Sequence, residues 1–335
     1  MSHVFKSITS KCLRNVKAPF LISWALTHRC NHRCLYCRIW KMRRRELSTK
    51  DTLFIINELA SMGAMLICLS GGEPLLRNDI GKITSFICKK NMSFDISSNG
   101  YLVKKKISQI EGVRVLCLSL DGPEKLHDQI RGRKGAYKNV LEAAHAAKKR
   151  NISVYFRTVL SKMNLSEIDH ILNIAAKLKI KVIFQPATQN LYGTDNKNSA
   201  APFTKQYKGV IDKLIVEKER GNEYIHNSIA LLKYNRRWPG VSRIKCISEK
   251  IFFHLEPDGM VYPCIWNRNL RALQGRDCLK LGIKEAIFTL PKASACKGCW
   301  DSAVCSLNFL LLDQSEIPHG NALSSDRAFL IEDNK

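Results

Sequence analysis

The sequence predicts an α/β fold with a parallel sheet, followed by a small cysteine-rich domain. Two observations support this prediction. Apolar runs of strand length alternate with helical patterns from about residue 20 to residue 185, which is typical of parallel strands joined by right-handed crossovers. Further along, six of the thirteen cysteines fall between Cys246 and Cys305. We therefore expect two domains, at residues 18–215 and 240–310.

Six strands and five helices make up the predicted sheet domain. The strands are expected at residues 20–26, 65–70, 93–97, 113–119, 153–159 and 181–185. The helices are expected at residues 49–62, 79–90, 103–109, 136–150 and 165–178. Ser48 precedes the first helix and Asp51 follows three residues later, a pattern typical of a helix start. Gly, Asn, Ser and Pro predict a loop at 186–202, before a further helix at 204–219.

The chain is strongly basic, with 54 Lys and Arg against 29 Asp and Glu and a formal net charge of +25. A basic surface raises the local concentration of anionic partners. The basic residues are spread along the whole sequence, and aromatic residues are not interleaved with them. A nucleic-acid partner is therefore not expected. An anionic substrate remains compatible with the charge.

The composition favours a cytoplasmic protein. No run of eighteen apolar residues occurs, so no transmembrane helix is expected. The first residues mix basic and apolar side chains without the apolar core of a secretory signal. They leave two alternatives open, a solvated helix or a short amphipathic helix that touches a membrane. Thirteen cysteines without such a signal indicate a reducing compartment and metal ligation rather than disulfides.

Three closely spaced cysteines, Cys30, Cys34 and Cys37, follow the first predicted strand. Their spacing, CxxxCxxC, supplies three thiolates where a tetrahedral zinc site or an all-cysteine four-iron cluster uses four. No further cysteine lies close behind them in sequence. We therefore expect an iron with an open coordination position. A zinc site completed by His28 or His32 is the alternative.

This spacing, with Tyr36 directly before the third cysteine, resembles the signature of the radical SAM superfamily. The resemblance implies a [4Fe-4S] cluster on the three cysteines, with S-adenosylmethionine bound to its unique iron. One-electron transfer then cleaves this cofactor to a 5′-deoxyadenosyl radical, which abstracts hydrogen from a substrate. The resemblance also implies a partial (β/α)6 TIM-like barrel and an electron donor such as flavodoxin or ferredoxin. In parallel barrels, functional groups gather at the C-terminal ends of the strands.

A glycine-rich turn, Gly71-Gly72-Glu73-Pro74, follows the second predicted strand. Adjacent glycines let a backbone approach a ligand closely, and a carboxylate accepts hydrogen bonds from an ammonium group. In this place the turn resembles the GGEP motif of the family. That motif holds the amino group of S-adenosylmethionine.

Polar residues near the ends of the third and fourth strands resemble further parts of that cofactor site. Ser98, Asn99 and Ser119 are expected at the ribose or the carboxylate of S-adenosylmethionine. Arg131 resembles the arginine that often pairs with the cofactor carboxylate, for which a planar guanidinium is suited. A surface ion pair is the alternative for Arg131. Arg157 lies on a predicted strand, and the pattern does not fix which way it faces.

The cysteine-rich region begins with a predicted hairpin. Asp258-Gly259 lies between apolar runs at 251–255 and 260–262, which is a strong hairpin signal. The hairpin is expected to bring Cys246 and Cys264 close together. Cys296 and Cys299 form a CxxC pair, and Cys305 follows. By spacing, zinc and iron–sulfur ligation suit these cysteines equally well.

The same cysteine pattern resembles the SPASM and twitch domains, which carry auxiliary clusters in radical SAM enzymes. The longer SPASM pattern has a further cysteine where this chain has Phe309. The resemblance therefore implies one auxiliary [4Fe-4S] cluster, expected on Cys246, Cys264, Cys296 and Cys299. Cys305 is either an alternative ligand or a structural neighbour.

These observations lead to one functional hypothesis and two alternatives. We expect a radical SAM oxidoreductase that abstracts hydrogen from its substrate and oxidises it through the auxiliary cluster. The substrate favoured by analogy is a ribosomal peptide, which makes the enzyme a maturase. The first alternative is a dehydrogenase or rearrangement enzyme that acts on an anionic small-molecule metabolite. The second is a zinc protein that binds nucleic acid. No catalytic acid, base or hydrogen donor is assigned.

Overall fold

The computed structural model describes residues 17–191, 196–240, 246–265, 274–291 and 299–311. Within these residues one sheet contains nine strands in the order β6-β5-β4-β3-β2-β1-β7-β8-β9. The strands are β1 (Leu21–Thr27), β2 (Leu66–Gly71), β3 (Ser93–Ser98), β4 (Val115–Ser119), β5 (Ser153–Leu160), β6 (Lys181–Pro186), β7 (Phe252–Leu255), β8 (Met260–Tyr262) and β9 (Arg276–Asp277).

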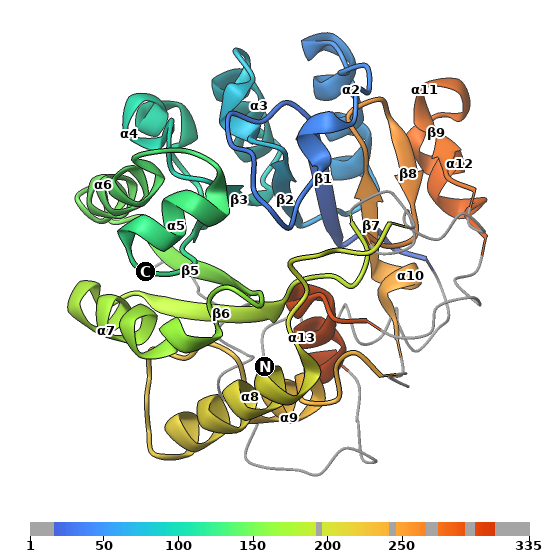
Figure 1. The fold of residues 1–335 in the computed structure, drawn as a ribbon. Coiled ribbons are helices and arrows are strands. Elements are labelled where there is room, and N and C mark those ends of the chain that lie inside the picture. Colours follow the sequence, from blue (N-terminus) through green and yellow to red (C-terminus); the bar gives the residue numbers. More distant parts are fainter. Residues whose placement is uncertain (1–16, 192–195, 241–245, 266–273, 292–298, 312–335) are drawn as a thin grey trace.

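The first six strands form the predicted parallel barrel. Each of β1 to β6 pairs in parallel with its neighbour in sequence, and the strands curve around a common interior (Figure 1). The predicted α/β fold class is confirmed, and each strand lies within two residues of its expected position. Because all six strands run the same way, their C-terminal ends meet at one rim.

The helices agree with the prediction in the barrel and exceed it elsewhere. Short helices not expected from the sequence occur after β4 and throughout the C-terminal region. The α-helices are α2 (Thr49–Ser61), α3 (Ile80–Lys89), α4 (Val103–Lys106), α5 (Glu124–Arg131), α6 (Ala136–Lys148), α7 (Ile168–Leu178), α8 (Thr204–Glu219), α9 (Ile229–Asn235), α10 (Ser248–Ile251), α11 (Cys278–Leu281), α12 (Ile283–Phe288) and α13 (Ser302–Leu311).

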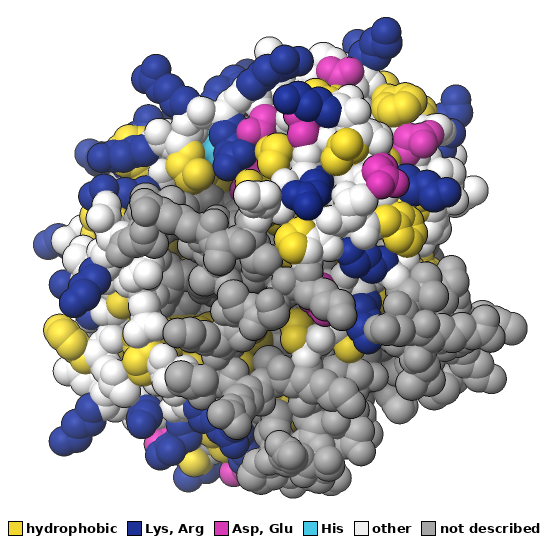
Figure 2. Space-filling model, turned by 90° about the vertical axis from the view of Figure 1, so that its right-hand side faces the viewer, with side chains coloured by type: hydrophobic (Ala, Val, Ile, Leu, Met, Phe, Trp, Pro, Cys, Tyr) yellow, Lys and Arg dark blue, Asp and Glu magenta, His cyan; other side chains and the backbone are white. Residues whose placement is uncertain are grey.

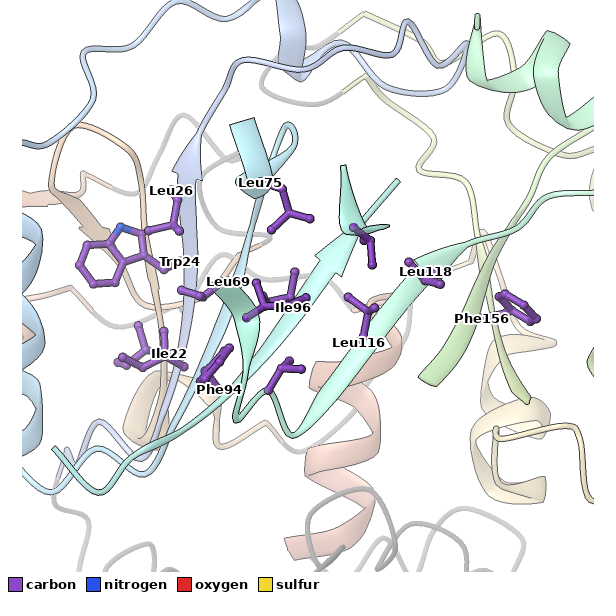
Figure 3. Packing of buried hydrophobic residues seen from close by; sticks show 14 of the residues in the cluster. Ile22, Trp24, Leu26, Leu69, Leu75, Phe94, Ile96, Leu116, Leu118 and Phe156 are labelled. Carbon is purple, nitrogen blue, oxygen red and sulfur yellow. The ribbon is translucent and has the colours of Figure 1, made fainter. Parts of the chain in front are cut away.

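The outer face of the barrel sheet packs against these helices. Alternate strand residues such as Ile22, Trp24 and Leu26 are buried there, together with their counterparts on neighbouring strands (Figure 3). Burial of a large apolar side chain contributes about 1.5–3 kcal/mol relative to exposure. The residues between them, including Ser23 and Ala25, face the other side, where they line a cavity. The strand period of two therefore divides each strand into a structural face and a cavity face.

The predicted hairpin is present, and it joins the barrel sheet. Strands β7 and β8 are antiparallel, and Gly259 in the connecting turn has a φ of 87°. In addition, β7 pairs in parallel with β1, from Leu21 opposite Phe252 to Trp24 opposite Leu255. The C-terminal region thus extends the barrel beyond its first strand.

A second apolar cluster lies between the start of the barrel and the C-terminal helices. It contains Phe20, residues of α9 and α10, and Val304 and Leu307 of α13. Cys264, Cys299 and Cys305 are buried in the same cluster. In the described part of the chain, no helix is long and apolar enough to cross a membrane.

Lys and Arg side chains are distributed over the described part of the face in Figure 2, with Asp and Glu among them. Among the described residues, several Lys and Arg side chains form ion pairs at the surface, such as Arg29 with Glu46 and Arg44 with Asp258. Exposed pairs of this kind contribute about 0–1 kcal/mol each. On this face the positive charge is therefore spread rather than gathered into one patch.

Candidate functional site

The loop with Cys30, Cys34 and Cys37 is fixed to the end of α5. The amides of Arg33 and Leu35 donate to the carbonyls of Arg131 and Ile130, at 3.0 and 2.9 Å. Gly132 ends α5 with a φ of 61°, and a Cβ added there would lie 2.5 Å from the Arg33 carbonyl oxygen. The glycine therefore supplies both the helix end and the space into which the loop packs.

The glycine pair at the end of β2 packs against the start of the same loop. A Cβ added to Gly71 or Gly72 would lie 2.2 Å from the carbonyl oxygen of Thr27 or Arg29, respectively. The Gly72 amide donates to the Thr27 carbonyl at 2.8 Å. We expected these glycines to permit close approach of a ligand. Their closest approach is instead to the cysteine loop, although both also line the neighbouring pocket.

Glu73 is fully buried and connects the glycine turn to the end of β3. Its carboxylate accepts hydrogen bonds from the Leu75 amide, the Ser98 hydroxyl and the Asn99 amide, at 3.2, 3.0 and 2.8 Å. Burial raises the pKa of Glu73 to about 7, partly offset by these hydrogen bonds. A carboxylate has about four acceptor positions, so three bonds leave one without a partner, although neither Glu73 nor Pro74 is among the residues that line the neighbouring pocket. Pro74, which follows, is buried at the start of a short 3-10 helix.

Asp121, Arg131 and Tyr36 form a buried polar network at the end of β4. The Asp121 carboxylate accepts from the Tyr36 hydroxyl at 2.9 Å and pairs with the Arg131 guanidinium at 2.8 Å. Arg131 also lies 3.9 Å from the Cys34 sulfur. Its Nε is buried and has no hydrogen-bond partner among the described residues. Arg131 is thus neither at the surface nor wholly available to a ligand.

These groups surround one pocket of about 180 Å³ at the C-terminal rim of the barrel. The three cysteines line it and are half-buried. Burial raises the pKa of Cys30 to about 11 and that of Cys37 to about 12. Metal binding therefore has to displace thiol protons. The expected residues that line the pocket are Cys30, Cys34, Tyr36, Cys37, Gly71, Gly72, Ser98, Asn99, Ser119 and Arg131.

The two histidines of the loop lie differently with respect to the three cysteines. His28 points to the C-terminal hairpin, where its Nε2 lies 2.6 Å from the Glu256 carboxylate. His32 is buried at the pocket, and burial with nearby arginines lowers its pKa to about 3. Among the described residues, no three His, Cys, Asp or Glu side chains lie close enough to bind one metal ion. In an iron–sulfur cluster each thiolate binds its own iron, so the cysteines stand further apart.

The second cysteine set is brought together only in part within the described residues. Cys264, Cys299 and Cys305 share the apolar cluster, and the Cys305 thiol lies 3.3 Å from the Cys299 carbonyl oxygen. Cys246 is exposed, and its sulfur lies 3.6 Å from Nδ2 of Asn308 on α13. Cys296 lies outside the described residues. Three of the four predicted ligands, Cys246, Cys264 and Cys299, therefore lie within the described residues.

A larger cavity of about 300 Å³ occupies the interior of the barrel. Cys37, Ser70, Gly71 and Ser97 line both this cavity and the rim pocket, so the two are continuous. Arg157 of β5 also lines both, which settles the direction that the sequence pattern left open. The remaining inward residues include Ser23, Cys68, Asp95, Cys117 and Asp301.

Asp121 is the site residue that the sequence reasoning missed. It follows β4 by two positions and lies ten residues before Arg131, its partner. An acidic residue after a buried parallel strand was the available signal.

Comparison with known proteins assigns this site to a family. The profile of the radical SAM superfamily matches residues 24–175. Residues 24–175 are a radical SAM domain. This stretch contains the three loop cysteines, the glycine turn and the Asp121 network.

Proteins similar to this chain include enzymes of two kinds. The chain is 33% identical over 171 residues to Fe-coproporphyrin III synthase of Methanosarcina barkeri, covering 49% of this chain and 42% of that protein. It is 26% identical over 267 residues to the mycofactocin maturase MftC of Mycolicibacterium smegmatis, covering 75% of this chain and 65% of that protein. The matched part is thus less than two thirds of either relative.

The fold is shared with a solved radical SAM structure across nearly the whole chain. Streptococcus suis SuiB, in a crystal structure bound to S-adenosylmethionine, superposes with a TM-score of 0.67 and 14% identity. The match covers 95% of this chain and 80% of SuiB, and it therefore includes the C-terminal region. The barrel and its C-terminal extension therefore share one fold with SuiB.

Proposed function

We propose that this protein is a radical SAM enzyme that oxidises a peptide by hydrogen abstraction. The observation that carries the proposal is the convergence of the cysteine loop, the glycine turn and the polar strand ends on one pocket, which opens into the barrel cavity. Cys30, Cys34 and Cys37 are the proposed cluster ligands. A reduced cluster with bound S-adenosylmethionine supplies a 5′-deoxyadenosyl radical.

The residues around the pocket fit a zwitterionic cofactor. Glu73 has an acceptor position left for an ammonium group, and Arg131 has a buried Nε left for a carboxylate. Ser98, Asn99 and Ser119 are the proposed polar contacts along the rest of the cofactor. Tyr36 packs against the Arg131 guanidinium, 5.5 Å from its ring centroid, and helps to hold it.

The protein's own contacts orient these groups before any ligand binds. Asp121 fixes Arg131 and Tyr36, while the Asn99 side chain donates to the Asn31 side chain at 2.7 Å within the cysteine loop. Preorganised polar groups spare the cost of ordering them during the reaction. The half-buried pocket also limits the access of water to a reactive radical.

For the C-terminal region we propose one auxiliary [4Fe-4S] cluster on Cys246, Cys264, Cys296 and Cys299, with Cys305 as an alternative ligand. The proposal is supported by the burial of Cys264, Cys299 and Cys305 in one cluster. Four cysteine ligands leave no iron open, which favours electron transfer over substrate binding. The proposed domains are residues 18–215 and 240–310. We further propose a flavodoxin or ferredoxin as electron donor and a cytoplasmic location.

The relatives support two substrate classes. Similarity to the mycofactocin maturase extends over 75% of the chain and reaches beyond the radical SAM domain, which favours a peptide. The second candidate is an anionic small molecule, favoured by the higher identity of 33% to Fe-coproporphyrin III synthase over a shorter stretch. Anaerobic incubation with each substrate class and mass analysis of the products separates the two.

The enzyme proposal is tested by metal analysis and cofactor cleavage. After anaerobic reconstitution we expect about eight iron and eight sulfide per chain, as for two four-iron clusters. The dithionite-reduced protein should convert S-adenosylmethionine to 5′-deoxyadenosine. Stoichiometric zinc without any such cleavage would contradict the proposal and favour a zinc protein.

A further inference from the structure

Arg157 is one of the residues that line both the rim pocket and the barrel cavity. It lies on the inward face of β5 and lines the rim pocket, the central cavity and a smaller side pocket. Its Nε is buried, with no hydrogen-bond partner among the described residues. A buried guanidinium without a fixed partner is costly, because its desolvation is not repaid by hydrogen bonds. Such a group is suited to a ligand.

The other charged groups of the cavity have partners of their own. Asp95 pairs with Arg114 at 2.5 Å. Asp301 precedes α13, and its carboxylate accepts from the Val304 amide at 3.0 Å. Cys117 contributes most to raising the pKa of Arg157, and the Asp301 and Asp95 carboxylates raise it further through space, yet neither carboxylate forms a hydrogen bond with it. The positive charge of Arg157 is therefore offset by carboxylates that do not form a contact with it.

The start of helix α13 lies beside Arg157. Ser302 and Ala303, in its first turn, line the same side pocket as Arg157. The N-terminus of a helix carries a partial positive charge and favours anions. The Asp301 carboxylate already caps this terminus, so the positive charge left for a ligand in this part of the cavity is that of Arg157.

We propose that Arg157 binds a carboxylate of the substrate and so orients the substrate below the radical site. This proposal rests on the proposed function, because it takes the rim pocket to be the cofactor site. It narrows the substrate to one that carries a carboxylate. A guanidinium binds a carboxylate through paired hydrogen bonds, which fixes direction as well as position. In the rim pocket, Arg131 is already paired with Asp121. Arg157 is thus available to the substrate.

Two cavity thiols allow a test that needs no known substrate. Cys117 is opposite Tyr155 in the β4–β5 pairing, which makes it a diagonal neighbour of Arg157 on the same face. Cys68 also lines the cavity, whereas Cys88 on α3 is exposed. Iodoacetate carries a carboxylate, and iodoacetamide is its neutral counterpart. Both alkylate a thiolate with loss of iodide, so their rate ratio at one cysteine cancels changes in thiol pKa.

The experiment measures this ratio by peptide mass spectrometry on the anaerobically reconstituted protein. We expect the iodoacetate preference at Cys117 or Cys68 to exceed that at Cys88 by about tenfold, since a charge-assisted bond favours the anionic reagent. Arg157→Gln should bring the preference down to the Cys88 value, and Arg157→Lys should retain part of it. Arg150→Gln is the matched control, because Arg150 forms an exposed ion pair with Glu111.

A second variant keeps the proposal testable if Arg157→Gln does not fold. Ala303→Asp places a carboxylate at the start of α13, where helices tolerate acidic residues. It should remove the preference although Arg157 is present. Equal ratios at all three cysteines in the wild type would overturn the proposal. Loss of the preference on addition of S-adenosylmethionine would also overturn it, because the carboxylate at Arg157 would then be that of the cofactor. No outcome depends on turnover, so failure of the proposed function is recognised separately.

Discussion

The two cysteine sets of this protein differ in what surrounds them. Cys30, Cys34 and Cys37 are half-buried at the barrel rim and line a pocket, among polar and charged side chains. Cys264, Cys299 and Cys305 are buried among apolar side chains and line neither the pocket nor the central cavity. Asp301 and Ala303, their neighbours in the chain, do face that cavity.

This difference indicates that the two cysteine sets have different roles. A metal centre beside an open pocket can meet a small molecule, whereas one enclosed by apolar residues is shielded from it. An enclosed centre near the cavity still suits electron transfer, which needs proximity rather than contact. The surroundings of the cysteines therefore distinguish the proposed initiating cluster from the proposed auxiliary cluster.

The largest effect is expected from removal of the first set. Replacing Cys30, Cys34 and Cys37 together by Ala should abolish 5′-deoxyadenosine formation, because the cluster that binds the cofactor loses its ligands. Liquid chromatography of the reduced reaction mixture measures this product. Cys88→Ala is the control, since Cys88 is an exposed cysteine on α3. Wild-type yields in the triple variant would remove the first set from the mechanism.

Removal of the second set should separate cleavage from product formation. Cys246→Ala with Cys264→Ala should lower iron from about eight to about four per chain. Some uncoupled 5′-deoxyadenosine should remain while the modified substrate disappears. Cys278→Ala is the control, because Cys278 is a buried cysteine of the same region outside the proposed ligand set. A normal yield of modified substrate in the double variant would show that the second cysteine set is not required for product formation.

A smaller effect concerns the protein scaffold around the first set. The pKa of Glu73 is about 7 in the folded protein, above the ordinary value of 4.5. Between these values the folded state holds more protons than the unfolded state, so stability falls as pH rises. The slope contributed by Glu73 approaches about 1.4 kcal/mol per pH unit. Urea unfolding between pH 5.5 and 7.5 should show this slope in the wild type but not in Glu73→Gln. Identical slopes would contradict it.

Much of the barrel was predictable because its strands are continuous apolar runs separated by helices with clear periodicity. The site at the rim was predictable for a related reason. Cysteines, adjacent glycines and an acidic turn are rare residue combinations, and parallel strands bring their ends to one edge. Cys30, Glu73 and Asn99 thus come together although they are far apart in sequence.

Other features depend on contacts that no local pattern encodes. The pairing of Arg131 with Asp121 requires α5 to fold back over the end of β4. The orientation of Arg157 depends on the phase of β5, which is set by packing on both of its faces. The short helices α9 to α12 are too brief to show a period and are stabilised by tertiary packing instead.

The parallel pairing of β7 with β1 has a consequence for how the chain reaches its native state. In synthesis from the N-terminus, Leu21 to Trp24 precede their partners, Phe252 to Leu255, by more than two hundred residues. Until those partners emerge, the outer edge of β1 has unpaired backbone groups, and exposed edges favour aggregation. The nascent chain therefore passes through a period in which its cysteine loop extends from an unprotected strand. Pairing of β1 with β2 satisfies only the opposite edge of β1, so the edge that faces β7 stays open until Phe252 to Leu255 emerge.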